Sequence, residues 1–179
     1  MEIETEKRRL FSDEGRSFSF DSRGTGYGRG EGCGIVVLKA LDRAQNDNDN
    51  VRSVIAASGI NQDGRTSGIT MPNGAAQGTL FLSLYICNIS DSIILESLME
   101  SVYHNAGIDP KETGYIEAHG TGTKVGDPIE VAALHKVFGE GRSARNPLFI
   151  GSVKSNVGHL EAASGKPCVA ALYLASDKI

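Results

Sequence analysis

The sequence contains no tryptophan, only five prolines and only three cysteines among its 179 residues. The cysteines, Cys33, Cys87 and Cys168, are odd in number and lack the spacing of metal ligands. This pattern disfavours a disulfide framework and indicates a reducing, cytoplasmic compartment. No segment combines a basic start, an apolar run and a small-residue cleavage site, so we expect no secretory signal. No apolar run is long enough for a confident membrane span.

An excess of basic residues is also missing. Lysine and arginine number 18 against 22 aspartates and glutamates, so the net charge is −4 and the isoelectric point is about 5.6. Because nucleic-acid-binding domains are usually basic, we expect no nucleic-acid partner. The content of 40% hydrophobic and 22% charged residues is that of an ordinary globular domain with one core.

Glycine, in contrast, is concentrated in one run. Every even position from 24 to 34 is glycine. A dinucleotide-binding fingerprint needs glycines separated by two and then by three residues, which a strict period of two does not supply. A P-loop is excluded as well, because no Gly-Lys-Ser/Thr is present. The remaining interpretation is close backbone packing, where any side chain would clash.

Predicted strands and helices alternate after this run. Apolar segments predict strands at 35–38, 51–57, 115–118 and 148–153, and helical periodicity predicts helices at 96–106 and 128–138. The first of these strands is expected to be buried on both faces, with Cys33 entering it as a small core residue. The inward face of helix 128–138 is expected to consist of Ile129, Ala132, Ala133, Val137 and Phe138. Strands alternating with helices predict a layered α/β fold.

His119 stands out because it lies between predicted strand 115–118 and a glycine loop. Open α/β sheets place their chemistry at the carboxyl ends of strands. Asp127 and Glu130 are three residues apart, which predicts a capping box at the start of the next helix. A lone histidine is more often a hydrogen-bonded structural residue than a catalyst, and His104 and His135 are interpreted in that way.

Four segments together resemble one protein family. Residues 117–130, EAHGTGTKVGDPIE, and 151–165, GSVKSNVGHLEAASG, resemble the two histidine motifs of β-ketoacyl synthases. Residues 18–32 and 61–73 match the family text that precedes these motifs. The chain is therefore similar to the ketosynthase domain of type I polyketide synthases, of the fungal reducing type.

The resemblance implies an incomplete thiolase-like fold with αβαβα layers. Residues 1–45 correspond to the end of its N-terminal half and 46–165 to part of its C-terminal half, while 166–179 form a non-family tail. Residues 78–95 are a non-family insert, since their removal restores both the family text and an unbroken helical stripe. We interpret the insert and the tail as translated intron sequence; the alternative for the insert is a lineage-specific loop.

The family joins an acyl group, held as a thioester on a cysteine, to a carbanion from decarboxylated malonyl-acyl carrier protein. By resemblance, His119 and His159 are the two imidazoles that donate to the enolate oxygen, and Lys154 fixes their electrostatics. The implied substrate-binding residues are Thr121, Thr123, Asn156 and Glu161, although both threonines also suit loop backbone groups.

The resemblance further implies the partners of the chain. They are acyl carrier protein, malonyl and acyl thioesters and, because the family is homodimeric, a second copy. No metal and no directly bound cofactor are expected, since the substrate is carried on the phosphopantetheine of acyl carrier protein.

One family feature has no counterpart in the sequence. The nucleophilic cysteine of the family lies in a Thr-Ala-Cys-Ser-Ser type turn upstream of the text that residues 18–32 match, and no cysteine here has that context. Three hypotheses therefore stand: a partial ketosynthase that is inactive alone, a non-catalytic module of the same fold that binds acyl carrier protein, and an unfolded gene-model fragment.

Overall fold

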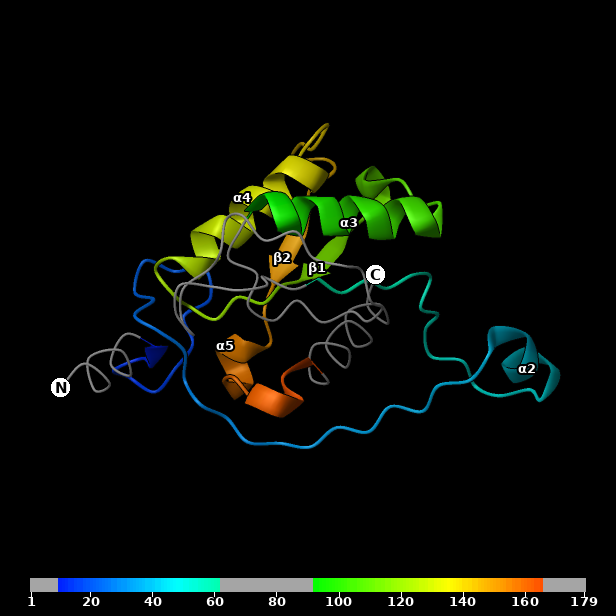
Figure 1. Cartoon of the computed structure of the whole chain (residues 1–179), viewed down its shortest axis with the longest axis horizontal. Helices are drawn as coiled ribbons and strands as arrows, with labels where there is room; N and C mark the ends of the chain where they lie inside the picture. Colours follow the sequence, from blue (N-terminus) through cyan, green and yellow to red (C-terminus); the bar gives the residue numbers. More distant parts are fainter. Residues whose placement is uncertain (1–9, 62–91, 166–179) are drawn as a thin grey trace.

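The computed structural model describes residues 10–61 and 92–165 (Figure 1). Its helices and strands are α2 (Leu41–Asn46), α3 (Ser92–Ala106), β1 (Tyr115–Glu117), α4 (Gly126–Phe138), β2 (Phe149–Gly151) and α5 (Lys154–Val157). Two 3-10 turns, η1 (Pro110–Glu112) and η2 (Glu161–Ala163), complete the set. The mixture of strands and helices confirms the predicted α/β class. None of the described helices is long and apolar enough to cross a bilayer.

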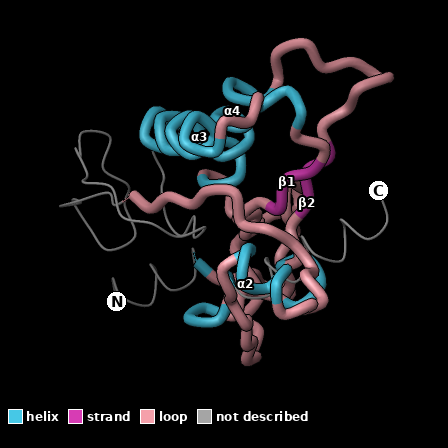
Figure 2. Tube along the Cα trace, turned by 90° about the vertical axis from the view of Figure 1, so that its right-hand side faces the viewer, coloured by secondary structure: helices cyan, strands magenta, loops and turns pink. Residues whose placement is uncertain are grey.

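The strands β1 and β2 lie side by side and run parallel (Figure 2). Tyr115 pairs with Phe149 and Glu117 pairs with Gly151, so the two strands end level with each other. Both were predicted, each slightly longer than observed. Because the carboxyl ends of parallel strands share one edge, the loop after β1 and helix α5 after β2 start from the same place.

Helices α3 and α4 pack together and hold most of the core. The buried cluster consists of Leu95, Met99, Ala118, Ala133, Leu134 and Phe138. The predicted inward face of α4 is partly wrong, because Ala132 is exposed and Leu134 is buried instead. The buried face is shifted because α4 also turns the carboxylates of Asp127 and Glu130 inward, and these set its rotation.

Helix α3 begins four residues before its predicted start. Residues 92–95, the end of the predicted insert, form its first turn, and Leu95 is only 1% exposed; residues 78–91 lie outside the described residues, as does the tail from 166. The helix stops at Gly107, whose φ of 67° favours glycine. The N–H of Gly107 donates to the carbonyl of His104, and that of Ile108 donates to Tyr103, which forms a Schellman motif.

The predicted strands at 35–38 and 51–57 are wrong, and so is the burial expected for the first of them. The side chains of Ile35 and Val37 are 88% and 91% exposed, and Val54 and Ile55 are more than half exposed. A strand needs a neighbouring backbone to pair with, and in the part of the chain that the structure describes neither segment has one. The first segment instead runs as an extended loop to α2, away from the body (Figure 1). Cys33 is likewise exposed and not a core residue.

The interpretation of the glycine run as close backbone packing is confirmed. A Cβ atom built on four of its members would lie within 2.6 Å of a main-chain atom; they are Gly24, Gly26, Gly28 and Gly30. The tightest case is Gly30, where the Cβ atom would be 2.1 Å from the carbonyl oxygen of Val157. The run therefore lies directly against the loops that carry the two predicted histidines.

Candidate active site

The first histidine is held through its backbone by a carboxylate of α4. Glu130 accepts hydrogen bonds from the N–H groups of His119 and Gly120, at 2.6 and 2.9 Å. The hydroxyl of Ser152 donates to the carbonyl of His119 at 3.2 Å. Glu130 is buried, and burial is the largest influence on its pKa, which is raised although these N–H bonds and Lys154 act to lower it. The backbone of the loop after β1 is thus held at two N–H groups and at one carbonyl oxygen.

A second carboxylate of α4, that of Asp127, binds the rest of the glycine loop. It accepts from the N–H groups of Gly122 and Phe20, at 3.1 and 2.8 Å. The predicted capping box is therefore wrong. Helix α4 begins at Gly126, before Asp127, and both carboxylates reach back over the loop to accept from its N–H groups. The hydroxyl of Thr123 accepts from Gly126 N–H instead, at 3.1 Å.

The second histidine is aligned by the glycine run. The N–H of His159 donates to the carbonyl of Gly28 at 2.7 Å, and its carbonyl accepts from Gly30 at 3.1 Å. The N–H of Glu161 donates to Nδ1 of the His159 imidazole at 2.8 Å. Because Nδ1 accepts a hydrogen bond, the neutral ring must carry its own hydrogen on Nε2. His159 is thereby fixed as an Nε2–H donor.

The structure brings the two histidines together, as the resemblance implied. The imidazole centroids of His119 and His159 are 5.6 Å apart, with the ring planes nearly perpendicular at 88°. One residue follows β1 and the other follows α5, so the shared edge of the parallel strands accounts for their meeting. The ring of Tyr27 lies on His159, with a centroid distance of 4.8 Å.

The electrostatics of this cluster keep both imidazoles neutral. Burial, followed by the charge of Lys154 and the neighbouring His159, lowers the pKa of His119 to about 3. Burial and Lys154 also lower the pKa of His159, against the opposing effect of Glu161. Lys154 itself is only 3% exposed at the start of α5. A neutral imidazole keeps one N–H to donate, which suits a site where negative charge develops on an oxygen.

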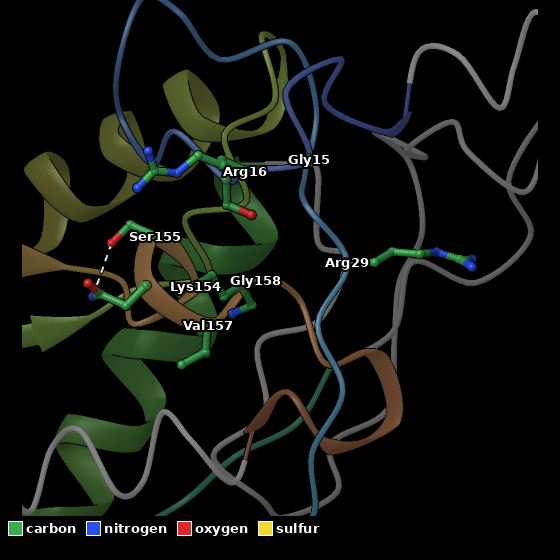
Figure 3. Close-up of a pocket in the computed structure, with 9 residues that line it drawn as sticks. Gly15, Arg16, Arg29, Lys154, Ser155, Val157 and Gly158 are labelled. Atoms are coloured by element: carbon green, nitrogen blue, oxygen red, sulfur yellow. Dashed lines mark hydrogen bonds between the residues drawn. The ribbon is translucent and has the colours of Figure 1, made fainter.

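The remaining predicted residues lie around this pair. Thr121 is buried, with its hydroxyl 3.4 Å from that of Thr123. Asn156 is exposed and lines, with Lys154, a polar cavity of about 170 Å³ beside α5 (Figure 3). The carboxylate of Glu161 pairs with Arg29 at 3.1 Å and its charge acts to raise the pKa of His159, while the backbone N–H of Glu161 donates to the imidazole.

Sequence reasoning missed two contributors to this site. Glu130 was assigned to a helix cap, because its spacing from Asp127 fits one, and Tyr27 had no assigned role. The signal for Glu130 was present in the loop, where consecutive residues in a glycine-rich turn leave N–H groups that a nearby acid can bind. Tyr27 and His159 are 132 positions apart in the sequence, and no local pattern predicts that their rings are in contact.

Two family models match the chain. One is described as the C-terminal domain of β-ketoacyl synthase and matches residues 52–177, and the other as the N-terminal domain of β-ketoacyl synthase and matches residues 3–44. The chain belongs to the β-ketoacyl synthase family. The predicted internal boundaries, including the insert at 78–95, stay predictions.

Curated relatives of this ketosynthase chain are fungal polyketide synthases. It is 55% identical over 157 residues to highly-reducing polyketide synthase 1 of Aureobasidium melanogenum, a match that covers 87% of the chain. It is 49% identical over 168 residues, or 94% of the chain, to highly reducing polyketide synthase ZEA2 of Gibberella zeae. The chain spans 6% of the length of each relative. The predicted resemblance to reducing polyketide synthases is confirmed.

Solved ketosynthases have the same fold. The structure superimposes with a TM-score of 0.79 and 37% identity on the ketosynthase from module 6 of the bacillaene synthase from Bacillus subtilis, covering 98% of this chain and 28% of that one. For the oxazolomycin ketosynthase domain OzmH KS7 of Streptomyces albus the TM-score is 0.74 at 32% identity, over 96% of this chain and 27% of that one. The thiolase-like class is confirmed, and the chain corresponds to part of a ketosynthase domain.

Proposed function

We propose that this chain carries the histidine and lysine part of a ketosynthase site that condenses acyl and malonyl thioesters. The observation that supports the proposal most strongly is the meeting of two neutral imidazoles, His119 and His159, beside the buried Lys154. Convergent neutral donors in a partly buried site suit an oxygen that becomes negatively charged during reaction.

The chemistry begins with the malonyl thioester. The bond between its α-carbon and its carboxylate breaks, carbon dioxide leaves, and the electron pair moves into the thioester to form an enolate. The imidazole N–H groups of His119 and His159 donate to the enolate oxygen. The enolate carbon then attacks the carbonyl of the acyl thioester, and the thiolate that held the acyl group leaves. Loss of one such donor typically costs 100- to 1,000-fold in rate.

The two halves of this reaction make different demands on the chain. Decarboxylation to an acetyl thioester needs the oxyanion donors and a proton from water on the enolate carbon, whereas condensation also needs an acyl-bearing cysteine. Cys33 is exposed and lies in the loop that leads to α2. We therefore propose that these 179 residues decarboxylate a malonyl thioester but do not condense it alone.

The proposal includes the partners implied by the family. The malonyl group arrives on the phosphopantetheine arm of acyl carrier protein in the cytoplasm, and a second copy of the ketosynthase completes a homodimer. Thr121, Thr123 and Asn156 are the proposed contacts of the arm, while Glu161 supports His159 through its N–H.

A non-catalytic module that binds acyl carrier protein is the second candidate. The exposed position of Cys33 favours it, because this cysteine has no nucleophile context and its segment has no strand partner among residues 10–61 and 92–165. The two candidates predict the same binding but different turnover.

The test is incubation of the purified chain with malonyl-acyl carrier protein, followed by mass spectrometry of the thioester. We expect acetyl thioester to appear, with no carbon–carbon bond formed and no acylated Cys33. His119→Ala and His159→Ala should each reduce this rate at least about 100-fold. His135→Ala, on the exposed face of α4, is the matched control and should leave the decarboxylation rate unchanged.

The other two hypotheses give different results. Binding of malonyl-acyl carrier protein without decarboxylation, by a chain with a cooperative circular-dichroism melt, would support the binding module. The absence of such a melt would indicate an unfolded fragment.

A further inference from the structure

A row of aromatic rings runs from the N-terminal part of the chain into the site. Phe11 meets Tyr27 edge to face at a centroid distance of 5.2 Å, and Tyr27 lies against His159 at 4.8 Å with a tilt of 39°. His159 in turn contacts His119 at 5.6 Å. Tyr27 is thus the ring through which the glycine run touches the second histidine.

The backbone on either side of Arg29 holds the same histidine. Gly28 and Gly30 exchange hydrogen bonds with the main chain of His159, at 2.7 and 3.1 Å. These bonds fix where the histidine backbone lies but leave its side-chain torsions free. Besides the Nδ1 hydrogen bond and the His119 ring, the ring of Tyr27 packs on the imidazole and restrains its plane.

The alignment matters because the tautomer depends on it. The Nδ1 atom of His159 accepts from the N–H of Glu161, whose backbone has a φ of 48°, a left-handed conformation that a non-glycine residue rarely adopts. The ion pair between Glu161 and Arg29 is exposed on both sides, and exposed pairs hold a backbone only weakly. A rotated imidazole would lose the Nδ1 bond and with it the fixed Nε2–H donor.

We propose that Tyr27 is a positioning residue for His159, whose ring keeps the imidazole aligned with the N–H of Glu161 and so keeps the hydrogen on Nε2. The inference deepens the proposed function, on which the importance of that donor rests, but its test reads the imidazole directly. The contact is between the two rings, so Tyr27→Phe, which keeps the ring, is the conservative variant.

The experiment is nitrogen-15 NMR of the histidine side chains in the whole chain. We expect the wild type and Tyr27→Phe to show His159 as the Nε2–H tautomer. Tyr27→Leu should give a mixture of tautomers, with the His159 pKa rising toward its ordinary value because water reaches the ring. The groups that act on this titration are Lys154, Glu161 and the backbone of His159 itself, and the neighbouring ring is that of His119. Tyr103→Leu, which removes a ring between α3 and α4, should leave the His159 signals unchanged.

A folded Tyr27→Leu chain whose His159 tautomer and pKa match the wild type would overturn the proposal. If that variant does not fold, Tyr27→Met fills a similar volume without a ring and must show the same mixture of tautomers; an unchanged tautomer in it overturns the proposal equally. A wild type with the Nε2–H tautomer and no malonyl decarboxylation would remove the proposed function and leave the role of Tyr27 standing.

Discussion

At the scale of residues, the site depends on buried carboxylates that bind main-chain N–H groups. Glu130 binds His119 and Gly120, and Asp127 binds the next part of the same loop. A buried acid is costly unless it is hydrogen-bonded, and a glycine loop leaves N–H groups that need acceptors. The carboxylates and the loop N–H groups therefore complete each other's hydrogen bonds. These hydrogen bonds hold the backbone of His119 in its position.

Replacing Glu130 should release the loop. In Glu130→Ala the N–H groups of His119 and Gly120 lose their acceptor, which we expect to lower the free energy of unfolding by on the order of 2–4 kcal/mol. Urea denaturation followed by circular dichroism measures this. Glu140→Ala removes an acid that is 81% exposed and should stay within about 0.5 kcal/mol of the wild type. Equal effects of the two substitutions would contradict the assigned role of Glu130.

The depressed pKa of His119 predicts how stability changes with pH. Its pKa is about 3 in the folded chain and about 6.5 when unfolded, so between these values the unfolded chain binds more protons. The contribution of the neutral His119 to the free energy of unfolding is fully present above about pH 6.5 and is lost as the pH falls toward 3. His159 acts in the same direction, and the raised pKa of Glu130 acts in the opposite one.

We therefore expect acidification from pH 7 to pH 5 to destabilise the chain, and His119→Gln to remove roughly 1–2 kcal/mol of that loss. Urea titrations of both proteins at the two pH values measure the difference. A pH dependence that is identical with and without the imidazole would show that His119 is not buried as a neutral group.

Part of this residue-scale picture could be predicted. The motif text singled out His119, His159 and Lys154, because each lies in a distinctive segment. The tautomer of His159 could not be predicted, since it depends on one N–H in a left-handed turn. The role of Glu130 was hidden because the same spacing serves a helix cap.

At the scale of elements, α3 and α4 form the structural unit behind the site. Leu95 and Met99 from α3 pack with Leu134 and Phe138 from α4, and a Glu96–Lys136 ion pair lies between the two helices. Amphipathic helices are readable from their periodicity, and both helices were predicted. The strands at 35–38 and 51–57 were not predicted correctly, because a strand exists only where another backbone pairs with it.

Leu95 tests whether the first turn of α3 belongs to the fold. It lies at the end of the predicted insert, and removing residues 78–95 would bring Gln77 to its buried position. Leu95→Ala should lower the free energy of unfolding by about 2–5 kcal/mol. Val131→Ala, at a site 39% exposed on α4, should lower the free energy of unfolding by much less than Leu95→Ala. A neutral Leu95→Ala would favour the interpretation of 78–95 as translated intron sequence, which sequencing of the messenger RNA then checks.

At the scale of the whole molecule, the chain exposes an apolar segment. The chain spans 28% of the length of a solved ketosynthase chain. Ile35, Val36, Val37 and Leu38 are all exposed, next to a body whose own core is small. Consecutive exposed apolar residues with strand propensity promote association between chains. The isolated chain is therefore expected to self-associate.

Charges in this segment should suppress the association. We expect Ile35→Lys with Val37→Lys to shift the chain toward monomer in light scattering and to reduce the binding of a hydrophobic dye. The thermal midpoint should stay the same, since both side chains are exposed in the folded chain. Lys39→Ala, which changes a neighbouring charge without adding one to the apolar run, is the control. A wild-type chain that is monomeric at tens of micromolar (on the scale at which such association is seen) would contradict this expectation.

We propose that His119 and His159 donate jointly to one thioester oxygen. The most direct test is a crystal structure of the chain with a malonyl-pantetheine analogue in which an amide replaces the thioester. We expect the amide oxygen within about 3.2 Å of a ring nitrogen of each histidine, with Nε2 as the nitrogen of His159. An oxygen bound away from the histidines, or in contact with only one of them, would contradict it.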